Sequence, residues 1–262
     1  MNPLLALFNQ KKENILNVYC TAGYPKLNST TRVIDALQSN GVDIVEIGMP
    51  YSDPLADGDT IQQSSSIALQ NGMRITVLLN QLNEYKPKLS VPLILMGYMN
   101  PLLQYGFAQF CAQAKQAGVC GLIIPDMPLT EYIQQYQSIM NEHELCSIFL
   151  VTPNTSKQRV LMIDGLTNGF IYAVSSSSTT GSTQDFEAVQ AYLLRLKSYE
   201  LRNPILVGFG ISTAAQYKQV CTVANGGIIG TAYIKALAQS SDIELITHEY
   251  IHSIRGSKQL VQ

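Results

Sequence analysis

Two carboxylic acids in the stretch Val45 to Ile61 (VEIGMPYSDPLADGDTI) have the residue types and spacing of an acid–base site. The first, Glu46, lies in an apolar run typical of a strand buried on both faces, where a carboxylate is costly unless it is paired or used in chemistry. Because strand side chains alternate, Glu46 shares its face with Ile44 and Gly48, and we expect it to point inward near the strand's carboxyl end. Asp57 follows in the loop, so both carboxylates can converge on one mouth. The alternative is a buried glutamate bound to backbone amides, followed by ordinary loop aspartates.

Glycine-rich segments late in the chain suggest a second kind of chemistry. They are SSSSTTG (Ser175 to Gly181), GFGIS (Gly208 to Ser212) and the pair Gly230-Thr231. Glycines let backbone N–H groups approach an anion, and the dipole of a following short helix adds to the attraction, so these segments predict a phosphate site. The alternative is that the glycines only end strands. GFGIS is not a dinucleotide-binding motif, because the third glycine and the downstream acidic residue are missing.

The sequence also contains a formal HExxH motif, from His248 to His252. We reject it as a metal site, because it lies in a terminal helix whose apolar residues indicate packing on an outer wall, and no third ligand is evident. His143 is expected to end a helix in contact with solvent. The chemistry therefore falls to the carboxylates and to Tyr172, which precedes the SSSSTTG loop. Periodicity leaves open whether Tyr172 points inward to a site or outward into packing.

Strand-like and helical segments alternate along the whole chain. Eight strands are predicted to begin near residues 15, 42, 92, 121, 146, 169, 204 and 226. This alternation favours one closed (β/α)8 (TIM) barrel over residues 1–262, with a short extra N-terminal helix, rather than an open doubly wound sheet. Ser29 or Thr30 is predicted to cap a helix, and Asn100-Pro101 to form a loop. In such a barrel the polar residues at the carboxyl ends of the strands share one face.

Composition narrows the function classes. The 262 residues carry a formal net charge of -2 without a basic cluster, which argues against nucleic-acid and anionic-membrane surfaces. Five scattered cysteines without a CxxC pair argue against a disulfide framework or a zinc knuckle. The N-terminal stretch does not resemble a secretory signal, and no apolar run reaches membrane-spanning length. We expect a soluble, intracellular protein that acts on a small molecule.

Eight sequence blocks in order resemble the α subunit family of tryptophan synthase. They are TAGYP, VEIGMPYSDPLADG, LMGYMNP, LIIPDMP, FLVTPNT, YAVSSSSTTG, GFGIST and IIGTAYIK. The resemblance covers nearly the whole chain. It implies a (β/α)8 barrel that cleaves indole-3-glycerol phosphate to indole and glyceraldehyde 3-phosphate by a retro-aldol reaction. It also implies an α2β2 tetramer with a β subunit that carries pyridoxal phosphate, and no cofactor or metal in this chain.

The family's functional positions can be transferred residue by residue. Glu46 matches the catalytic acid and base, Asp57 the carboxylate that binds the indole N–H, and Tyr172 a tyrosine beside the substrate. The matching phosphate positions are Gly181, Gly210, Gly230 and Thr231. The matching indole-pocket positions are Tyr19, Met96, Ile123, Leu150 and Phe209. Asp53 and Pro54 match residues at or near the β-subunit contact.

Some positions depart from the family pattern. Ser178-Thr179 stands where a glycine is usual, Asp59 replaces a common proline, and Asn225 stands where aspartate is frequent. Two alternatives therefore stay open: a catalytically weak, α-like partner that binds indole or regulates the β subunit, and a free-standing enzyme that releases indole. The resemblance implies a cytoplasmic protein, or a stromal one if the chain is plastid-encoded.

Overall fold

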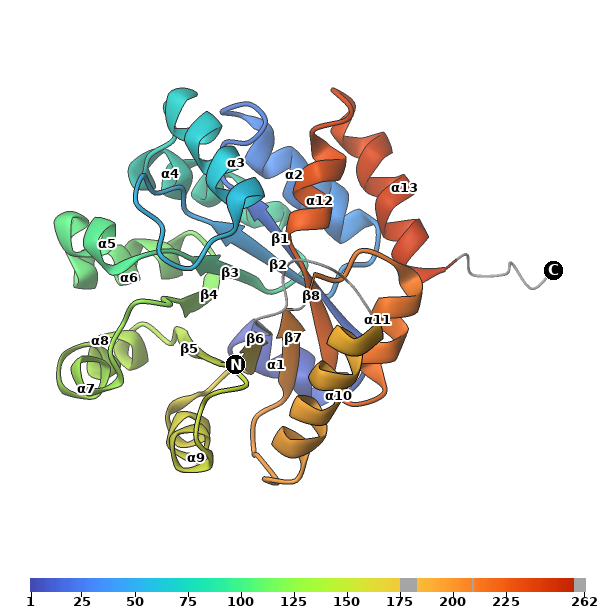
Figure 1. Cartoon of the computed structure of the whole chain (residues 1–262). Helices are drawn as coiled ribbons and strands as arrows, with labels where there is room; N and C mark the ends of the chain where they lie inside the picture. Colours follow the sequence, from blue (N-terminus) through green and yellow to red (C-terminus); the bar gives the residue numbers. More distant parts are fainter. Residues whose placement is uncertain (175–182, 209, 257–262) are drawn as a thin grey trace.

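Eight parallel strands close into a barrel in the order in which they occur in the chain (Figure 1). The computed structural model describes residues 1–174, 183–208 and 210–256. The strands are β1 (Ile15–Thr21), β2 (Ile44–Gly48), β3 (Leu93–Met96), β4 (Val119–Ile123), β5 (Cys146–Val151), β6 (Ile171–Val174), β7 (Ile205–Gly208) and β8 (Gly226–Ile229). β8 pairs with β1 and completes the cylinder. The predicted fold class and all eight predicted strands are confirmed.

Helices surround the barrel and connect its strands (Figure 1). They are α1 (Pro3–Gln10), α2 (Ser29–Ser39), α3 (Asp59–Gln70), α4 (Ile75–Tyr85), α5 (Met99–Tyr105), α6 (Phe107–Gln116), α7 (Leu129–Glu131), α8 (Gln137–Glu142), α9 (Lys157–Leu166), α10 (Thr183–Lys197), α11 (Ala214–Cys221), α12 (Thr231–Leu237) and α13 (Ile243–Arg255). Two short helical turns complete the set: η1 (Lys86–Lys88) follows α4 and precedes β3, and η2 (Tyr132–Tyr136) joins α7 to α8. Within the described ranges, no helix combines the length and the apolar character needed to cross a bilayer.

Two local predictions were wrong. Asn100 and Pro101 lie in α5 rather than in a loop. A proline is tolerated there because the first-turn N–H groups of a helix have no partner inside the helix. The N-cap of α2 is Asn28, and the predicted caps serve the preceding turn instead: Ser29 Oγ accepts from the N–H of Lys26, and Thr30 Oγ1 from that of Gly23.

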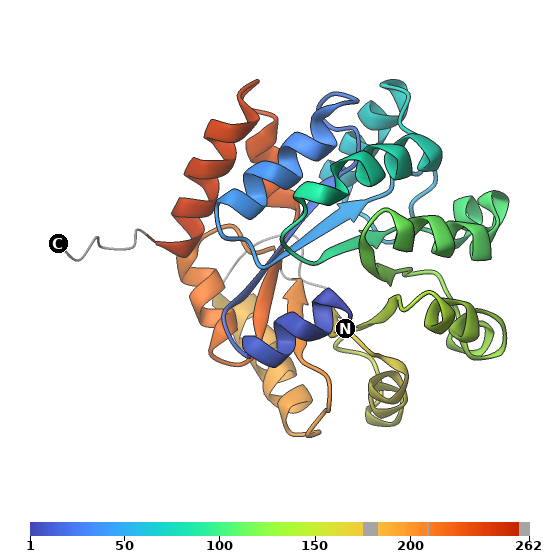
Figure 2. The same ribbon diagram turned by 180° about the vertical axis from the view of Figure 1, so that it is seen from behind.

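The barrel interior has its own apolar cluster, separate from the layer between strands and helices. It consists of Leu4, Phe8, Ile15, Ile44, Ile94, Cys120, Ile123, Cys146, Ile148, Phe170, Leu206 and Ile228. Leu4 and Phe8 come from α1, which lies across the end of the barrel where the strands begin (Figure 2). Because α1 closes this end with apolar side chains, polar chemistry is left to the end where the strands finish.

Candidate active site

Glu46 lies in the middle of β2 and points into the barrel. All five residues of β2 are buried, and Glu46 has 0% of its surface exposed. Its neighbours Val45 and Ile47 belong to the outer apolar layer, so alternation turns Glu46 to the interior. Its Oε2 accepts a 2.6 Å hydrogen bond from Nδ2 of Asn17 on β1. The predicted inward direction is confirmed. The alternative prediction was that backbone amides would bind this carboxyl group. Among the described residues its hydrogen-bond partner is instead a side-chain amide.

Burial sets the protonation state of Glu46. The pKa of Glu46 is raised to about 8: loss of hydration is the main cause of the rise, the hydrogen bond from Asn17 opposes it, and the charge of Asp57 adds to it. A carboxyl group with this pKa is mostly protonated at neutral pH. Glu46 can therefore act as an acid under conditions in which an ordinary carboxyl has lost its proton.

Asp57 lies in the loop between β2 and α3 and is half-buried. Partial burial raises its pKa, while a hydrogen bond from the Tyr98 hydroxyl lowers it. The same hydroxyl accepts a 3.1 Å bond from the N–H of Ala56, so Tyr98 ties the loop to the end of β3. The two predicted carboxylates thus face one mouth, in different surroundings. Different surroundings give two acids in one site different pKa values, so that one can donate a proton while the other stays ionised.

Tyr172 points inward from β6, which settles the choice that periodicity left open. Its ring packs against the inner cluster, and the charges of Glu46 and Asp57 add to the burial that raises the pKa of its hydroxyl. The ring needs the glycine on the next strand: a Cβ at Gly208 would lie 2.5 Å from the Tyr172 hydroxyl oxygen. Side chains from β2 and β6, and the loop after β2, therefore meet in the barrel interior.

The predicted indole-pocket residues share this interior where the structure describes them. Tyr19 is in register with Glu46, and its hydroxyl occupies the place that a Cβ would take at Gly48. Ile123 belongs to the inner cluster, and Met96 and Leu150 pack against it. The site consequently has an apolar wall beside its acids, as an aromatic ligand requires. Phe209 lies outside the described residues.

Three of the predicted phosphate positions are described, and they follow the adjacent strands β7 and β8. Gly210 has a φ of +38°, and apart from Gly210 and its chain neighbours no described residue has an atom within 4 Å of the position of a Cβ there. Gly230 is the N-cap of α12, and Thr231 is its exposed first residue. No side chain of the described ranges caps α12, whereas the N–H groups of Ser212 and Thr213 before α11 already bond to Gln216. The N-terminus of α12 is therefore the better place for an anion, because the described side chains do not already occupy its N–H groups. Gly181 lies outside the described residues.

The departures from the family pattern have separate places. Asp59 is the exposed first residue of α3, where a negative charge favours the helix dipole. Asn225 lies before β8, accepts from the N–H of Ile205 and donates to the Lys12 carbonyl, so both halves of its amide are used far from the mouth. The Ser178-Thr179 segment lies outside the described residues.

The HExxH motif lies on the surface, away from the mouth. His248 and His252 are exposed on α13, which packs against α2 and α12 on the outer wall (Figures 1 and 2). Nδ1 of His248 is 2.8 Å from Oδ1 of Asn40. Among the described residues, no three groups of metal-ligating type come together. His143 is the half-exposed C-cap of α8, as predicted.

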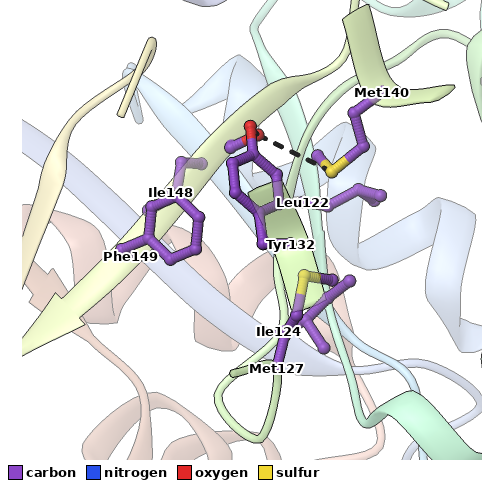
Figure 3. Close-up of a pocket in the computed structure, with 8 residues that line it drawn as sticks. Leu122, Ile124, Met127, Tyr132, Met140, Ile148 and Phe149 are labelled. Carbon is purple, nitrogen blue, oxygen red and sulfur yellow. Dashed lines mark hydrogen bonds between the residues drawn. The ribbon is translucent and has the colours of Figure 1, made fainter. Parts of the chain in front are cut away.

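A small pocket lies between strands β4 and β5 and the helical segment that joins them. Leu122, Ile124, Met127, Tyr132, Met140, Ser147, Ile148 and Phe149 line it (Figure 3). Its volume is about 10 Å³, room for about one water molecule. The Tyr132 and Ser147 hydroxyls lie 2.6 Å apart, and the Ser147 hydroxyl also contacts the Met140 sulfur. None of the predicted site residues is among those that line this space.

Two residues of the site escaped prediction. Asn17 is fully buried in β1 and holds Glu46, and Tyr98 holds Asp57. Asn17 carried a signal, since it is an amide in an apolar strand and shares a face with Tyr19. Tyr98 gave none, because a tyrosine at the end of an apolar run is as typical of packing as of a site.

The loop carrying the predicted partner contact is open to solvent. Asp53 is exposed and Pro54 half-buried, and Leu55 beside them has 83% of its surface exposed. The loop therefore joins an apolar surface residue to the segment that bears Asp57.

Comparisons with known proteins agree with this geometry. A family model described as "Tryptophan synthase alpha chain" matches residues 5–261. Proteins of that name from Parabacteroides distasonis (49% identity; 90% of this chain, 93% of the relative) and Flavobacterium johnsoniae (47%; 94% and 97%) are similar to it. Solved structures include the subunit from Pyrococcus furiosus (TM-score 0.87, 32% identity; 94% of this chain, 100% of that chain) and from Legionella pneumophila (0.88, 32%; 97% of each). With its closed barrel and paired acids, the chain belongs to the tryptophan synthase alpha chain family.

Proposed function

We propose that this chain is a carbon–carbon lyase that cleaves indole-3-glycerol phosphate to indole and glyceraldehyde 3-phosphate, the known reaction of its family. One observation carries the proposal. Glu46 is a fully buried carboxyl with a pKa of about 8, and Asp57 lies close enough for its charge to raise that pKa. This is the pair that the chemistry needs, because one group must deliver a proton and the other must stabilise positive charge.

The steps balance with Glu46 as the only proton carrier. Protonated Glu46 gives its proton to C3 of the indole ring, and the ring becomes a cation. The Asp57 carboxylate binds the ring N–H and stabilises this charge. Glu46, now ionised, takes the proton of the glycerol hydroxyl on the carbon next to the ring. The C–C bond then breaks, its electrons restore the neutral indole, and the hydroxyl-bearing carbon becomes the aldehyde. Glu46 ends the cycle protonated, as it began.

The remaining residues bind the substrate. Tyr172 lies beside the reacting bond, and the indole ring packs on Tyr19, Met96, Ile123, Leu150 and Phe209. The phosphate binds to backbone N–H groups at Gly181, Gly210, Gly230 and Thr231, supported by the N-terminus of α12. A backbone site of this kind explains how a dianion could be held without a basic side chain at these positions.

The proposed partner is a tryptophan synthase β subunit, in an α2β2 assembly. Asp53 and Pro54 would lie at this contact, and the exposed Leu55 gives it an apolar centre. Pyridoxal phosphate would belong to the β subunit, and this chain would need no cofactor for its own step. The cell compartment would be the cytoplasm, as for an enzyme of amino-acid biosynthesis.

The test is indole release from indole-3-glycerol phosphate by the purified chain, alone and with a β subunit. We expect slow release alone and faster release in the complex. Glu46→Gln keeps the shape of the side chain but cannot carry the proton, so indole release should fall about a hundredfold or more. A wild-type chain that stays inactive with the β subunit, yet binds it, would be the weak α-like partner instead. Full activity without a β subunit would identify a free-standing enzyme.

A further inference from the structure

The amide of Asn17 is buried without an evident structural need. It stands in β1 in register with Ile44 and Ile228, whose apolar side chains fill the barrel beside it. Asn17 has 0% of its surface exposed. An amide at such a place costs free energy unless its hydrogen bonds are made, and an apolar side chain of the same size would avoid that cost. The reason for an amide at this position should therefore lie in the group that it binds.

Asn17 binds the carboxyl group of Glu46 and no other described side chain. Its Nδ2 donates to Glu46 Oε2 over 2.6 Å. Within the described part of the chain, Oδ1 of Asn17 and Oε1 of Glu46 are buried and have no hydrogen-bond partner. The two oxygens of Glu46 are therefore unequal, because Oε2 is held and Oε1 is available.

This inequality fixes where the proton of Glu46 resides. A neutral carboxyl has one O–H, and an oxygen that accepts a bond from an amide N–H is the carbonyl-type oxygen. With Oε2 accepting from Asn17, the proton lies on Oε1. The bond from Asn17 also restricts rotation of the carboxyl group, so Oε1 keeps one direction.

We propose that Asn17 is a positioning residue that holds Oε2 of Glu46 and so presents Oε1 to the substrate as the oxygen that gives and takes the proton. The inference rests on the proposed function, since it names the atom of Glu46 that does the chemistry. In this role Asn17 acts through Glu46 and needs no contact of its own with the ring or the breaking bond.

The Asn17 amide also affects the ionisation of Glu46. A hydrogen bond from an N–H favours the carboxylate, so Asn17 lowers the pKa that burial raises. Among the described residues, the other titratable groups in electrostatic contact with Glu46 are Asp57, the hydroxyls of Tyr19 and Tyr172, and the thiol of Cys20. None of them supplies a positive charge. Removal of the Asn17 amide should thus raise the pKa of Glu46.

The experiment compares three variants with the wild type. Asn17→Leu removes the amide at nearly constant size, Asn17→Ala removes it without adding bulk, and Ile228→Val changes the neighbouring strand but keeps the amide. The pKa of Glu46 is measured without substrate, by ¹³C NMR titration of glutamate-labelled protein in which Glu46→Gln identifies the signal. The pH profile of kcat is measured in parallel with a β subunit.

We expect Asn17→Leu and Asn17→Ala to raise the pKa of Glu46 by about one unit and to lower kcat about tenfold, with a smaller change in KM. Ile228→Val should do neither. A pKa that is unchanged or lower in both Asn17 variants, while the wild type releases indole, overturns the inference alone. A loss of kcat without a pKa change would make Asn17 a packing residue and also overturns it. A wild type that releases no indole overturns the proposed function.

Discussion

Asp57 raises the pKa of Glu46, although Asp57 is half-buried in a loop and Glu46 is fully buried in the strand before it. The short link through Gly48 and Pro50 turns the chain at the mouth and brings Asp57 back toward the barrel interior. The two acids are therefore coupled, and a change at one is measurable at the other.

The first prediction follows from this coupling. Asp57→Asn removes a negative charge, so the pKa of Glu46 should fall below about 8. The same variant cannot offset the ring charge, and kcat should fall about a hundredfold while substrate still binds. NMR titration and steady-state kinetics check the two parts. If kcat is unchanged and only KM rises, Asp57 is a binding group.

The second prediction concerns stability. The pKa of Glu46 is raised from an ordinary value of 4.5 to about 8 in the folded protein. Between these values the folded state keeps a proton that the unfolded state has lost, so the contribution of Glu46 to stability falls as the pH rises from 4.5 to 8. Glu46→Gln has no proton to lose. Its free energy of unfolding relative to wild type should increase between pH 5 and pH 9, on the order of several kcal/mol.

Urea denaturation at the two pH values measures this difference. Glu142→Gln is the control, because Glu142 is exposed at the end of α8. Its difference from wild type should be nearly the same at both pH values. An equally flat result for Glu46→Gln would show that Glu46 ionises normally in the folded protein.

The third prediction tests the phosphate site. Gly210→Val should weaken binding of glycerol 3-phosphate about tenfold or more, because a β-branched residue resists a φ of +38° and its side chain would enter the space left for the anion. Isothermal titration gives the affinity. Gly41→Val is the matched control, since Gly41 also has a positive φ and open space but lies before β2, at the far end of the barrel. Equal affinities for the two variants would move the phosphate site elsewhere.

The fourth prediction tests coupling to the partner. Binding of the β subunit to the loop of Asp53 and Pro54 could favour the position of Asp57 that cleavage needs, and such coupling is typically worth about five- to a hundredfold in rate. Indole release at saturating substrate should rise by this factor in the complex, and Pro54→Ala should reduce the rise. No stimulation of the wild type, in a complex seen by sedimentation, would contradict the coupling.

The sequence alone determined the order and number of the strands and the inward direction of Glu46. Both depend on local patterns: apolar runs separated by turn residues, and an alternation that leaves an acid on the inner face of a buried strand. The family blocks added the reaction and the positions of its residues. Such patterns reach only a few residues, so they fixed α1 and the eight strands well but gave Asn100 and Pro101 as a loop where a helix forms.

Tertiary structure decided what touches what. Tyr172 points inward because Gly208 on the next strand leaves room for its ring. Asn17 reaches Glu46 across 29 residues of sequence, from a neighbouring strand. The pKa of Glu46 depends on how completely the barrel excludes water and on the charge of Asp57. A short stretch of sequence predicts neither of these. Periodicity assigns a side chain to a face, whereas its partner and its protonation are set by strands that only closure of the barrel brings together.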